Sequence, residues 1–580
     1  MSSDTQASAG TNRLANRYAA WRAGSVRVAT GLVSTPEPRS IGLYARGRQL
    51  VSGNILLAGH LAEAPGRSLW DITSPDPAFD QAAQGFGWLD DLAALGDATA
   101  RARAQEWTWD WIARYGTGRG PGWTPDLTGR RIIRWLHHGL LLLTATDKAH
   151  TDAYYRALTR QTAFLARRWR AAAPGLPRFE ALTGLIYAGL SLTGMESHAR
   201  VAAAALAREC RDEIDAEGGL PTRNPEELLD VFTLLTWAAQ ALAEADHKIP
   251  PAHAAAIERI APALRALRHA DGGLARFHGG GRGLEGRLDH ALAQAGVRAA
   301  SSVGLSMGFA RLAAGRTTVI ADAASPPGAA AAATAHASTT AFELTSGRRP
   351  VIVCCGSGAP FGSDWRRAGR ATASHSTLSV EGFSSSRLGP AIGAVEPLTD
   401  RARLIASRQT HGPDGGHLYM AHDGWSATHG LTASRTLHLS PDGRKLTGRD
   451  ALMATSPAER MRFEDVMTRS RLQGLRFAVR FHLHPDVDAT VDMGGNAVSI
   501  ALKSGEIWVF RPSGRASLTL DPSVYLEKGR LKPRATKQIV LSGHATDFET
   551  VVGWTLAKAQ DTPLAIRDLD RDDPPPVPLD

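Results

Sequence analysis

The sequence contains little cysteine and no long apolar run, and both shortages limit the fold. Only Cys210, Cys354 and Cys355 occur in 580 residues, which excludes a disulfide-dense scaffold. A membrane-spanning helix needs about 18 consecutive apolar residues, and the nearest candidate, LHHGLLLLTA, is interrupted by His137 and His138. We therefore expect no integral membrane segment. Hydrophobic residues make up 43% of the chain, enough for a sizeable core.

Signals for nucleic-acid binding and for export are also missing. The chain has no zinc-finger spacing, basic tail or aromatic RNA-binding motif, so nucleic acid is not expected as a partner. The first segment, MSSDTQASAGTNRLANRY, is polar and lacks the apolar stretch of a signal peptide, which predicts a cytoplasmic location from the sequence alone. The net charge of +9, from 66 Lys and Arg against 57 Asp and Glu, is compatible with an anionic partner such as an acidic polysaccharide.

The first part of the chain has the apolar spacing of helices. Apolar residues recur every three or four positions in RIIRWLHHGLLLL, FEALTGLIYAGLSL and PEELLDVFTLLTWAAQALAEA. Gly and Pro separate these stretches, for example at residues 174–175 and 218–219. The pattern predicts stacked antiparallel helical hairpins over residues 59–322, after an N-terminal segment at residues 1–58.

The second part changes to the period of two that is typical of strands. TAFELTSG, RPVIVCCG, STLSVEG and RFAVRFHLH alternate or are rich in β-branched residues, and Gly, Pro, Asn and Asp lie between such stretches. We expect an antiparallel β-sandwich over residues 339–562. The low-complexity stretch ASPPGAAAAATAHAS predicts a linker at residues 323–338, and the composition of residues 563–580 predicts a disordered tail.

Several short segments, in one order along the chain, carry a family resemblance. They are GGLPTRNPEELL (residues 218–229), RHADGGLARFHGGG (268–281), WRRAGRATASHSTLSVEGFSSS (365–386) and AHDGW (421–425). Together they resemble the heparinase II/III family of polysaccharide lyases, and the third is the most specific because it is similar to the family's W-R…R-x-x-x-x-H-[NS]-T stretch. The resemblance implies an α/α toroid, an incomplete barrel of helical hairpins, followed by an antiparallel β-sandwich.

The resemblance also implies cleavage of an acidic, uronate-containing glycan by β-elimination. Such a reaction needs a group that neutralises the C5 carboxylate, a base that removes the C5 proton and an acid that protonates the departing O4 oxygen. Carried over onto this sequence, Arg223 and Asn224 are the candidates for carboxylate binding, and His278 and His375 are the candidates for proton transfer. The elimination itself requires no cofactor.

The Arg223-Asn224 pair has a second interpretation. Pro225 follows it and opens a predicted helix, and the exposed N–H groups at the start of a helix favour anions. That context suits carboxylate binding. Asn is also a preferred N-cap residue, and Pro is a preferred first helical residue. Helix initiation alone therefore also explains the motif.

Three positions depart from the family pattern. The resemblance places a toroid tyrosine where this chain has Phe277-His278, and Phe309 occupies another position at which relatives often have Tyr. Thr334 falls on the catalytic histidine of the sandwich. Phe cannot exchange a proton, whereas a histidine with its ordinary pKa near 6.5 can. We expect His278 to be accessible because its loop is rich in Gly, although a loop histidine can also be purely structural.

A zinc site in the sandwich is a further implication of the resemblance. His336 falls on the family's metal-binding histidine, Cys354 or Cys355 falls on its metal-binding aspartate, and His375 falls on its third ligand. Thiolate and imidazole both suit Zn²⁺, so His336, Cys354 and His375 are predicted to hold a structural zinc ion. The alternative is that both cysteines are buried strand residues, a common location for free Cys, and that His375 is a packed structural histidine.

Basic and aromatic side chains supply the candidate polysaccharide contacts. Arginine suits the bidentate capture of carboxylate or sulfate, and aromatic rings can stack on sugars. Two groups qualify: Arg130, Arg131 and Trp135 in one, and Trp365, Arg366, Arg367 and Arg370 in the other. A solvated basic face is the alternative for the second group. We interpret His482 and His484 as structural.

The sequence thus predicts a polysaccharide lyase, and it leaves two alternatives. One is a catalytically altered glycan-binding or envelope-polysaccharide biogenesis protein on the same scaffold, which the Phe and Thr departures favour. The other is a hydrolase, which would need two carboxyl groups about 5–9.5 Å apart at the cleft. No convincing pair is evident among Asp215, Glu217, Glu226 and Glu227. The family's usual association with the cell envelope makes the envelope a second candidate location.

Overall fold

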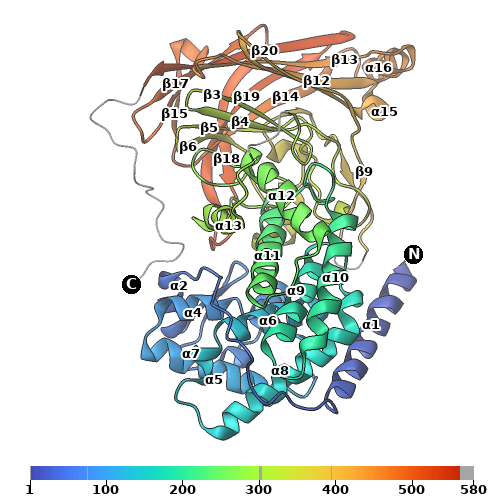
Figure 1. The fold of residues 1–580 in the computed structure, drawn as a ribbon. Helices are drawn as coiled ribbons and strands as arrows, with labels where there is room; N and C mark the ends of the chain where they lie inside the picture. The colour runs from blue at the N-terminus through green and yellow to red at the C-terminus, as the bar shows by residue number, and fades with distance from the viewer. Residues whose placement is uncertain (1, 75, 300–303, 393–394, 562–580) are drawn as a thin grey trace.

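The chain forms a helical part and a part made of two β-sheets, which lie against one another (Figure 1). The computed structural model describes residues 2–74, 76–299, 304–392 and 395–561, with side chains from residue 11 onward. The predicted tail at residues 563–580 lies outside the described residues. The predicted order of an α/α toroid followed by an antiparallel β-sandwich is confirmed.

The helical part contains the longer helices, which pack as successive neighbours. Helix α6 contacts α8 and α9, α9 contacts α10 and α11, and α11 contacts α12, while α1 lies along α8. A hairpin of β1 (Asn54–Leu57) and β2 (His60–Glu63) follows α2. The helices are α1 (Ser2–Ala23), α2 (Tyr44–Val51), α3 (Pro77–Gln84), α4 (Trp88–Leu95), α5 (Ala98–Tyr115), α6 (Pro125–His137), α7 (Gly139–Leu143), α8 (Lys148–Arg168), α9 (Leu176–Ser191), α10 (Glu196–Glu213), α11 (Pro225–Glu244), α12 (Pro251–Ala266) and α13 (Arg287–Ala295).

Capping residues begin these helices where the apolar spacing predicts them. The side chain of Asp97 accepts a hydrogen bond from the backbone N–H of Ala100, and Asp147 does the same for His150. Pro125 and Pro225 occupy first helical positions. A capping oxygen satisfies backbone donors that have no partner within the helix, and proline at the first position loses no helical hydrogen bond.

Helices α6 and α9 cross at a pair of glycines. A Cβ atom on Gly184 would lie 2.6 Å from the Cα atom of Gly129, closer than real Cβ contacts allow. The crossing brings Arg130 of α6 to Glu180 of α9, with 2.6 Å between Nε and Oε1. The two small residues therefore fix the position of a charged pair that lines a cavity of the toroid, described below.

We expect Gly184→Ala to lower the free energy of unfolding by about 1–3 kcal/mol, because the added methyl group forces the two helices apart. Chemical denaturation followed by circular dichroism measures the change. Gly31→Ala is the matched control, since among the described residues no heavy atom lies within 4 Å of a Cβ atom built there. The control should change stability by less than about 0.5 kcal/mol. A Gly184→Ala protein as stable as the wild type would contradict the close crossing.

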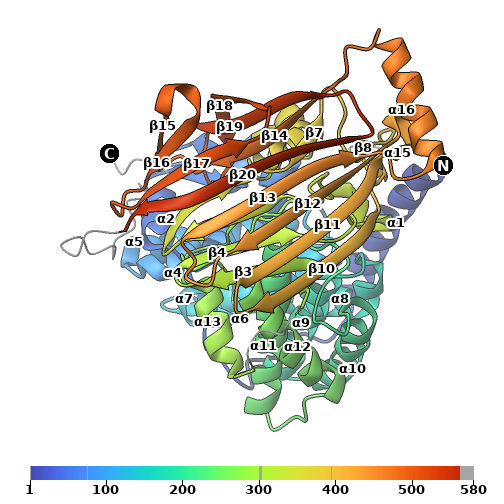
Figure 2. The same cartoon turned by 90° about the horizontal axis from the view of Figure 1, so that it is seen from above.

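The two sheets are antiparallel throughout and stack as a sandwich above the helices (Figures 1 and 2). The inner sheet has the order β18-β19-β14-β6-β5-β4-β3, with β7 beside β14. Its strands are β3 (Phe309–Ala314), β4 (Thr317–Asp322), β5 (Phe342–Ser346), β6 (Arg349–Val353), β7 (Leu378–Val380), β14 (Leu475–Leu483), β18 (Ser517–Tyr525) and β19 (Arg534–Ala545).

The outer sheet has the order β10-β11-β12-β13-β20-β17-β16-β15. Its strands are β10 (Leu404–Gly412), β11 (Gly415–Trp425), β12 (Leu431–Leu439), β13 (Lys445–Met453), β15 (Asp488–Asp492), β16 (Ala497–Ala501), β17 (Ile507–Ser513) and β20 (Glu549–Gln560). The pair β8 (Arg387–Leu388) and β9 (Leu398–Asp400) and the helices α14 (Ser363–Gly369), α15 (Ser426–His429) and α16 (Pro457–Arg469) lie in connections between strands.

The two parts share one hydrophobic core. Phe309, Ile320, Ala341 and Cys354 come from the sandwich but belong to the same buried cluster as the toroid residues. A second cluster, which includes Phe481 and other aromatic side chains, fills the space between the sheets. A continuous apolar contact disfavours independent motion of two domains, so the toroid and the sandwich hold the groups at their junction in fixed positions.

The structure differs from the predicted domain division at the end of the helical domain and in the linker. Residues 309–322, assigned from the sequence to the helical domain, form the hairpin of β3 and β4 in the inner sheet. A six-residue apolar stretch cannot be distinguished from a helix by periodicity, and Gly315, with φ +52°, makes the turn. The predicted linker is also not a solvated spacer, because residues 335–338 are buried against the junction.

None of the helices in the described part of the chain has the length and apolar character that a membrane span requires.

Candidate functional site

A buried carboxylate, Asp322 at the end of β4, connects the toroid to the sandwich. Its Oδ1 lies 2.6 Å from Nη2 of Arg223, and its Oδ2 accepts a 2.7 Å hydrogen bond from Ser338. Nε2 of His278 lies 3.3 Å from Oδ2. Burial would raise the pKa of Asp322, but the nearby Arg223 guanidinium, the contact with His278 and the Ser338 hydrogen bond hold it well below its ordinary value. The carboxylate is therefore ionised and fully engaged.

Arg223 is committed to the same junction. Its guanidinium donates to the backbone carbonyls of Met307 (3.0 Å), Ser325 (2.8 Å) and Gly308 (2.9 Å), in addition to Asp322. The backbone of Arg223 has φ +50°, in the left-handed region. These bonds occupy four of the five N–H donors of a guanidinium. Binding of a substrate carboxylate by Arg223 stays a prediction, and it would require the side chain to leave these partners.

Asn224 caps helix α11. Its Oδ1 accepts hydrogen bonds from the backbone N–H groups of Glu226 (3.0 Å) and Glu227 (3.2 Å), and Pro225 is the first helical residue. The helix-initiation interpretation of this motif is confirmed. A Cβ atom on Gly280 would lie 2.5 Å from the Asn224 Oδ1 atom, so the neighbouring loop covers the cap. Carboxylate binding by Asn224 stays a prediction.

Three histidines follow one another through the junction. The ring centroids of His278 and His336 are 6.3 Å apart, and those of His336 and His375 are 5.3 Å apart. Nδ1 of His278 accepts a 3.2 Å hydrogen bond from the backbone N–H of His336. The residues are only 0%, 3% and 0% exposed, respectively. The expectation of an accessible His278 is wrong, because the segment that carries His336 covers its loop.

Burial keeps these rings neutral. It lowers the pKa of His375 to about 3, and it lowers the pKa of His278 and of His336 as well. Neither ring nitrogen of His375 has a hydrogen-bond partner among the described residues. A neutral imidazole can in principle accept a proton, but a substrate could reach His278 or His375 only after the junction opens.

The predicted zinc ligands do not come together. Among the described residues, the one group of three His, Cys, Asp or Glu side chains with all ligand atoms within 4.8 Å of one another lies on the outer sheet and contains neither His336, Cys354 nor His375. The Cys354 side chain belongs to the shared apolar core, and burial raises the pKa of its thiol well above the ordinary value. In this arrangement the three ligand atoms are not grouped as a zinc site requires, and zinc binding by these residues stays a prediction.

Cys355 has a different environment from Cys354. Its Sγ lies 3.6 Å from Nδ1 of His482, and that nitrogen lies 2.7 Å from Oγ of Ser523. Burial would raise the pKa of the Cys355 thiol, but His482 and Ser523 outweigh it and lower the pKa below the ordinary value. His482 also contacts the carbonyl of Ala373 at 3.0 Å, so its interpretation as a structural residue agrees with its contacts.

A second buried carboxylate, Glu343 on β5, also joins the two parts. It accepts hydrogen bonds from the backbone N–H groups of Arg276 (3.0 Å) and Cys354 (3.2 Å), and His269 lies 3.3 Å away. Burial would raise the pKa of Glu343, but His269 and Arg276 lower it to about 2. Sequence analysis missed both Asp322 and Glu343. The available signal was an acidic residue within an apolar strand, which is rarely buried without a partner.

A cavity within the toroid has a volume of about 420 Å³ and is strongly charged. Its basic lining residues are Arg39, Arg46, Arg130, Arg134 and Arg287, and its acidic ones are Asp90, Asp91, Glu180 and Asp230. Trp88 and Trp237 also line it. Of the predicted substrate contacts, Arg130 lines this cavity, and its side chain is 32% exposed.

The other predicted contacts lie elsewhere. Arg131 and Trp135 are fully buried, and Arg131 donates to Gln161 at 2.6 Å while its guanidinium lies 4.2 Å from the Trp111 ring centroid. Arg370 is also buried and donates to the carbonyl oxygens of three residues in the junction: Ala335, Ala332 and Glu396. Trp365, Arg366 and Arg367 lie on α14, where Arg367 is exposed and pairs with Glu396.

Two carboxyl groups in the cavity titrate near neutral pH. Burial raises the pKa of Glu180 to about 7, despite its contact with Arg130, and burial raises the pKa of Asp91 to about 6. Burial would also raise the pKa of Asp90, but Arg134 and His138 lower it to about 2. Oε2 of Glu180 has no hydrogen-bond partner among the described residues. The net charge of the cavity therefore depends on pH.

A smaller cavity of about 120 Å³ lies between toroid and sandwich. Arg46 and Leu284 line both cavities, so the two adjoin. Tyr525 lines the smaller one; burial raises its pKa to about 12, and the Arg276 guanidinium lies 4.0 Å from its ring centroid. The junction thus holds a tyrosine supplied by β18 of the sandwich, which sequence analysis did not single out.

The fold is similar to that of solved polysaccharide lyases. The structure is similar to heparinase III, with a TM-score of 0.64 and 12% identity over 93% of this chain and 88% of that one. It is also similar to a mutant of the heparan sulfate lyase HepC from Pedobacter heparinus, with a TM-score of 0.59 and 14% identity over 95% of this chain and 89% of that one. At such identities the likeness concerns the fold alone.

Sequence comparison gives the family. Residues 296–555 match the family model described as Heparinase II/III-like, C-terminal. The chain is 31% identical over 552 residues to FtsZ-localized protein C of Caulobacter vibrioides, and the match covers 91% of each protein. The chain therefore belongs to the heparinase II/III family, as its motifs suggest.

The junction makes a stability prediction. We expect Asp322→Asn to lower the free energy of unfolding by about 3–5 kcal/mol, because it leaves the buried Arg223 guanidinium without its counter-ion. Denaturant unfolding measures the loss. Glu549→Gln is the matched control, since its pair with Arg449 is about half exposed on both sides (51% and 57%) and should contribute at most about 1 kcal/mol. Similar losses in the two variants would contradict the role of Asp322.

Proposed function

We propose that this protein binds an acidic polysaccharide in the toroid cavity and does not cleave it. The observation that carries the proposal is that the anion-binding arginines and the predicted proton-transfer histidines lie in different places. Five arginines line the open cavity, whereas His278 and His375, the predicted proton-transfer groups, are fully buried at the junction. The protein is then a catalytically altered, glycan-binding member of a family whose scaffold it keeps.

The cavity suits a polyanion. Guanidinium groups bind carboxylate and sulfate in bidentate geometry, and Arg130, Arg134 and Arg287 each remain partly exposed, with side-chain exposures of 32%, 20% and 30%. Each of them pairs with a carboxyl group across the cavity, so an anionic ligand competes with protein carboxyls. Protonation of Glu180 removes one of these competitors and favours the ligand.

The groups that β-elimination requires do not line the toroid cavity. The reaction needs a base at C5 and an acid at O4, and Phe277 and Phe309, both buried, stand where the resemblance places tyrosines. Arg223, the predicted carboxylate ligand, is held by Asp322 and three carbonyl groups. A lyase would have to break these contacts in every catalytic cycle.

Cleavage is the second candidate, and one observation favours it. Tyr525 borders the smaller cavity at the junction, and burial keeps its phenol protonated, as a general acid for the departing O4 would require. A lyase on this scaffold would then use a tyrosine from the sandwich in place of one from the toroid.

The test combines a binding measurement with an absorbance measurement. We expect the double variant Arg130→Ala/Arg134→Ala to bind uronate polysaccharides at least about tenfold more weakly, since charge-assisted hydrogen bonds contribute about 1.5–3 kcal/mol each. Arg403→Ala, at a side chain that is 80% exposed on the sandwich, is the matched control and should bind normally. Heparin, alginate and chondroitin sulfate serve as ligands, and circular dichroism verifies folding.

Absorbance near 232 nm, where the unsaturated uronate product of elimination absorbs, is followed in the same samples. We expect no rise with any of the three polysaccharides. A rise that disappears in Tyr525→Phe would establish the lyase and overturn the proposal. Binding that is unaffected by the double arginine substitution would place the site outside the toroid cavity.

Binding should also depend on pH through Glu180. Below its pKa of about 7 the carboxyl group is neutral, and above that value it adds a negative charge beside Arg130. We expect affinity for an acidic glycan to fall by about tenfold between pH 6 and pH 8. Glu180→Gln, which keeps an acceptor for Arg130, should reduce this dependence. A pH profile identical in wild type and variant would contradict the assignment.

The curated relative supports a proposal about location. That protein is named for localisation with FtsZ, and 31% identity over 91% of both chains favours a related setting for this one. We propose that the protein acts at the cell envelope where division takes place. A fluorescent fusion that stays dispersed in dividing cells, under conditions where an FtsZ fusion forms its ring, would oppose this proposal.

A further inference from the structure

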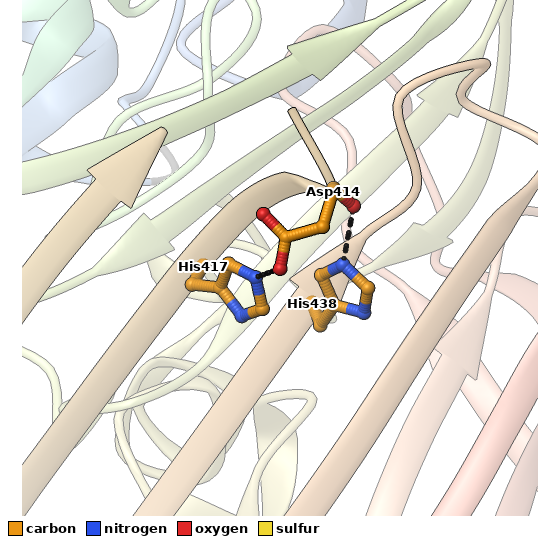
Figure 3. A group of neighbouring side chains, drawn as sticks. All are labelled: Asp414, His417 and His438. Carbon is orange, nitrogen blue, oxygen red and sulfur yellow. Dashed lines mark hydrogen bonds and ion pairs between the residues drawn. The ribbon is translucent and has the colours of Figure 1, made fainter. Parts of the chain in front are cut away.

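The outer sheet carries a cluster of metal-ligating side chains that does not include the junction residues. Asp414 lies in the turn that joins β10 to β11, His417 lies on β11 and His438 lies on β12. His417 and His438 are paired directly across the two strands. Figure 3 shows the two imidazole rings side by side, with Asp414 above them.

The three residues already contact one another, through both the side chain and the backbone of Asp414. Nε2 of His417 lies 2.8 Å from Oδ2 of Asp414, and Nε2 of His438 lies 2.8 Å from the backbone carbonyl oxygen of Asp414. The rings are nearly parallel, with an interplanar angle of 10° and a centroid distance of 4.1 Å. One ligand atom from each residue falls within 4.8 Å of the other two. No other set in the described part of the chain meets this condition.

We propose that Asp414, His417 and His438 bind one divalent transition-metal ion such as Zn²⁺. Two imidazoles and a carboxylate form a donor set that suits zinc, copper, nickel or cobalt and does not suit Ca²⁺ or Mg²⁺, which prefer oxygen ligands only. Zinc lies about 2.0–2.2 Å from such ligands, which places tetrahedral neighbours about 3.3 Å apart. The His417 and Asp414 ligand atoms are 2.8 Å apart, and all three ligand atoms lie within 4.8 Å of one another.

Small side-chain rotations are therefore enough to form the site. The ion takes the place of the hydrogen between Nε2 of His417 and Oδ2 of Asp414. In the neutral imidazole that proton moves to Nδ1, so that Nε2 offers its lone pair to the metal. Asp414 is exposed and both histidines are partly exposed, so an ion enters from solvent and a water molecule completes the coordination. Bound metal would tie the β10–β11 turn to β12.

The β10–β11 turn holds Asp414 in a fixed position. Gly415 has φ +121°, and a Cβ atom there would lie 2.1 Å from the carbonyl oxygen of Leu439 on β12. Only glycine permits this close approach between the turn and the neighbouring strand. The backbone that carries Asp414 is therefore fixed against the strand that carries His438.

The proposal is tested by titration with Zn²⁺ and Co²⁺ on the full-length, metal-free protein. We expect saturation at one ion per chain in calorimetry, and we expect visible absorption bands from bound Co²⁺. His438→Asn and His417→Asn should each weaken binding by more than the roughly 10- to 100-fold that loss of an outer hydrogen-bonding partner costs a metal site.

His411→Asn is the matched control. His411 is exposed on the adjacent strand β10, where it bonds Gln409, and it is paired with Gly416 while the position opposite His417 is Thr410. Its side chain therefore points to the other face of the sheet, and the variant should bind like wild type. Absence of saturable binding, or equal binding by wild type and a His417→Asn/His438→Asn protein, would overturn the proposal. Circular dichroism verifies that all variants are folded.

Discussion

The buried ion pair of Asp322 and Arg223 is the interaction on which the arrangement of the two parts depends. Asp322 receives Arg223 from the start of α11, Ser338 from the segment before β5 and His278 from a toroid loop. Removal of either charge would leave the other uncompensated in a water-excluded position. The pair therefore fixes the register of toroid against sandwich. For the same reason, Arg223 is not available as an open anion-binding group.

The Asp322–Arg223 pair explains how the family fold can be kept while the function of the protein changes. Internal contacts occupy Asp322 and Arg223 at the junction, and the junction histidines are neutral and inaccessible. The neighbouring toroid cavity remains open and charged. A fold hosts different functions through the sites it carries, so recognition of a polyanion in the cavity does not need the chemistry that the resemblance places at the junction.

The overall architecture could be predicted because local signals agree with the fold. Caps such as Asp147 and helix-period apolar spacing mark the toroid, and alternation marks the sandwich. The hairpin at residues 309–322 was missed because short apolar strands carry no distinguishing period. The burial of His278 depends on a distant segment of the chain. His336, which donates its backbone N–H to the His278 ring, lies 58 positions further along the sequence. The charged cavity combines residues as far apart in sequence as Asp91 and Arg287. No local sequence motif predicts such a set.

The most direct measurement is a crystal structure of the protein with a saturated uronate tetrasaccharide. The account predicts an intact tetrasaccharide in the toroid cavity, with carboxylate or sulfate groups against Arg130, Arg134 and Arg287, and with His375 still buried. A saccharide seated at the junction against Tyr525, or a cleaved product with an unsaturated end, would contradict it.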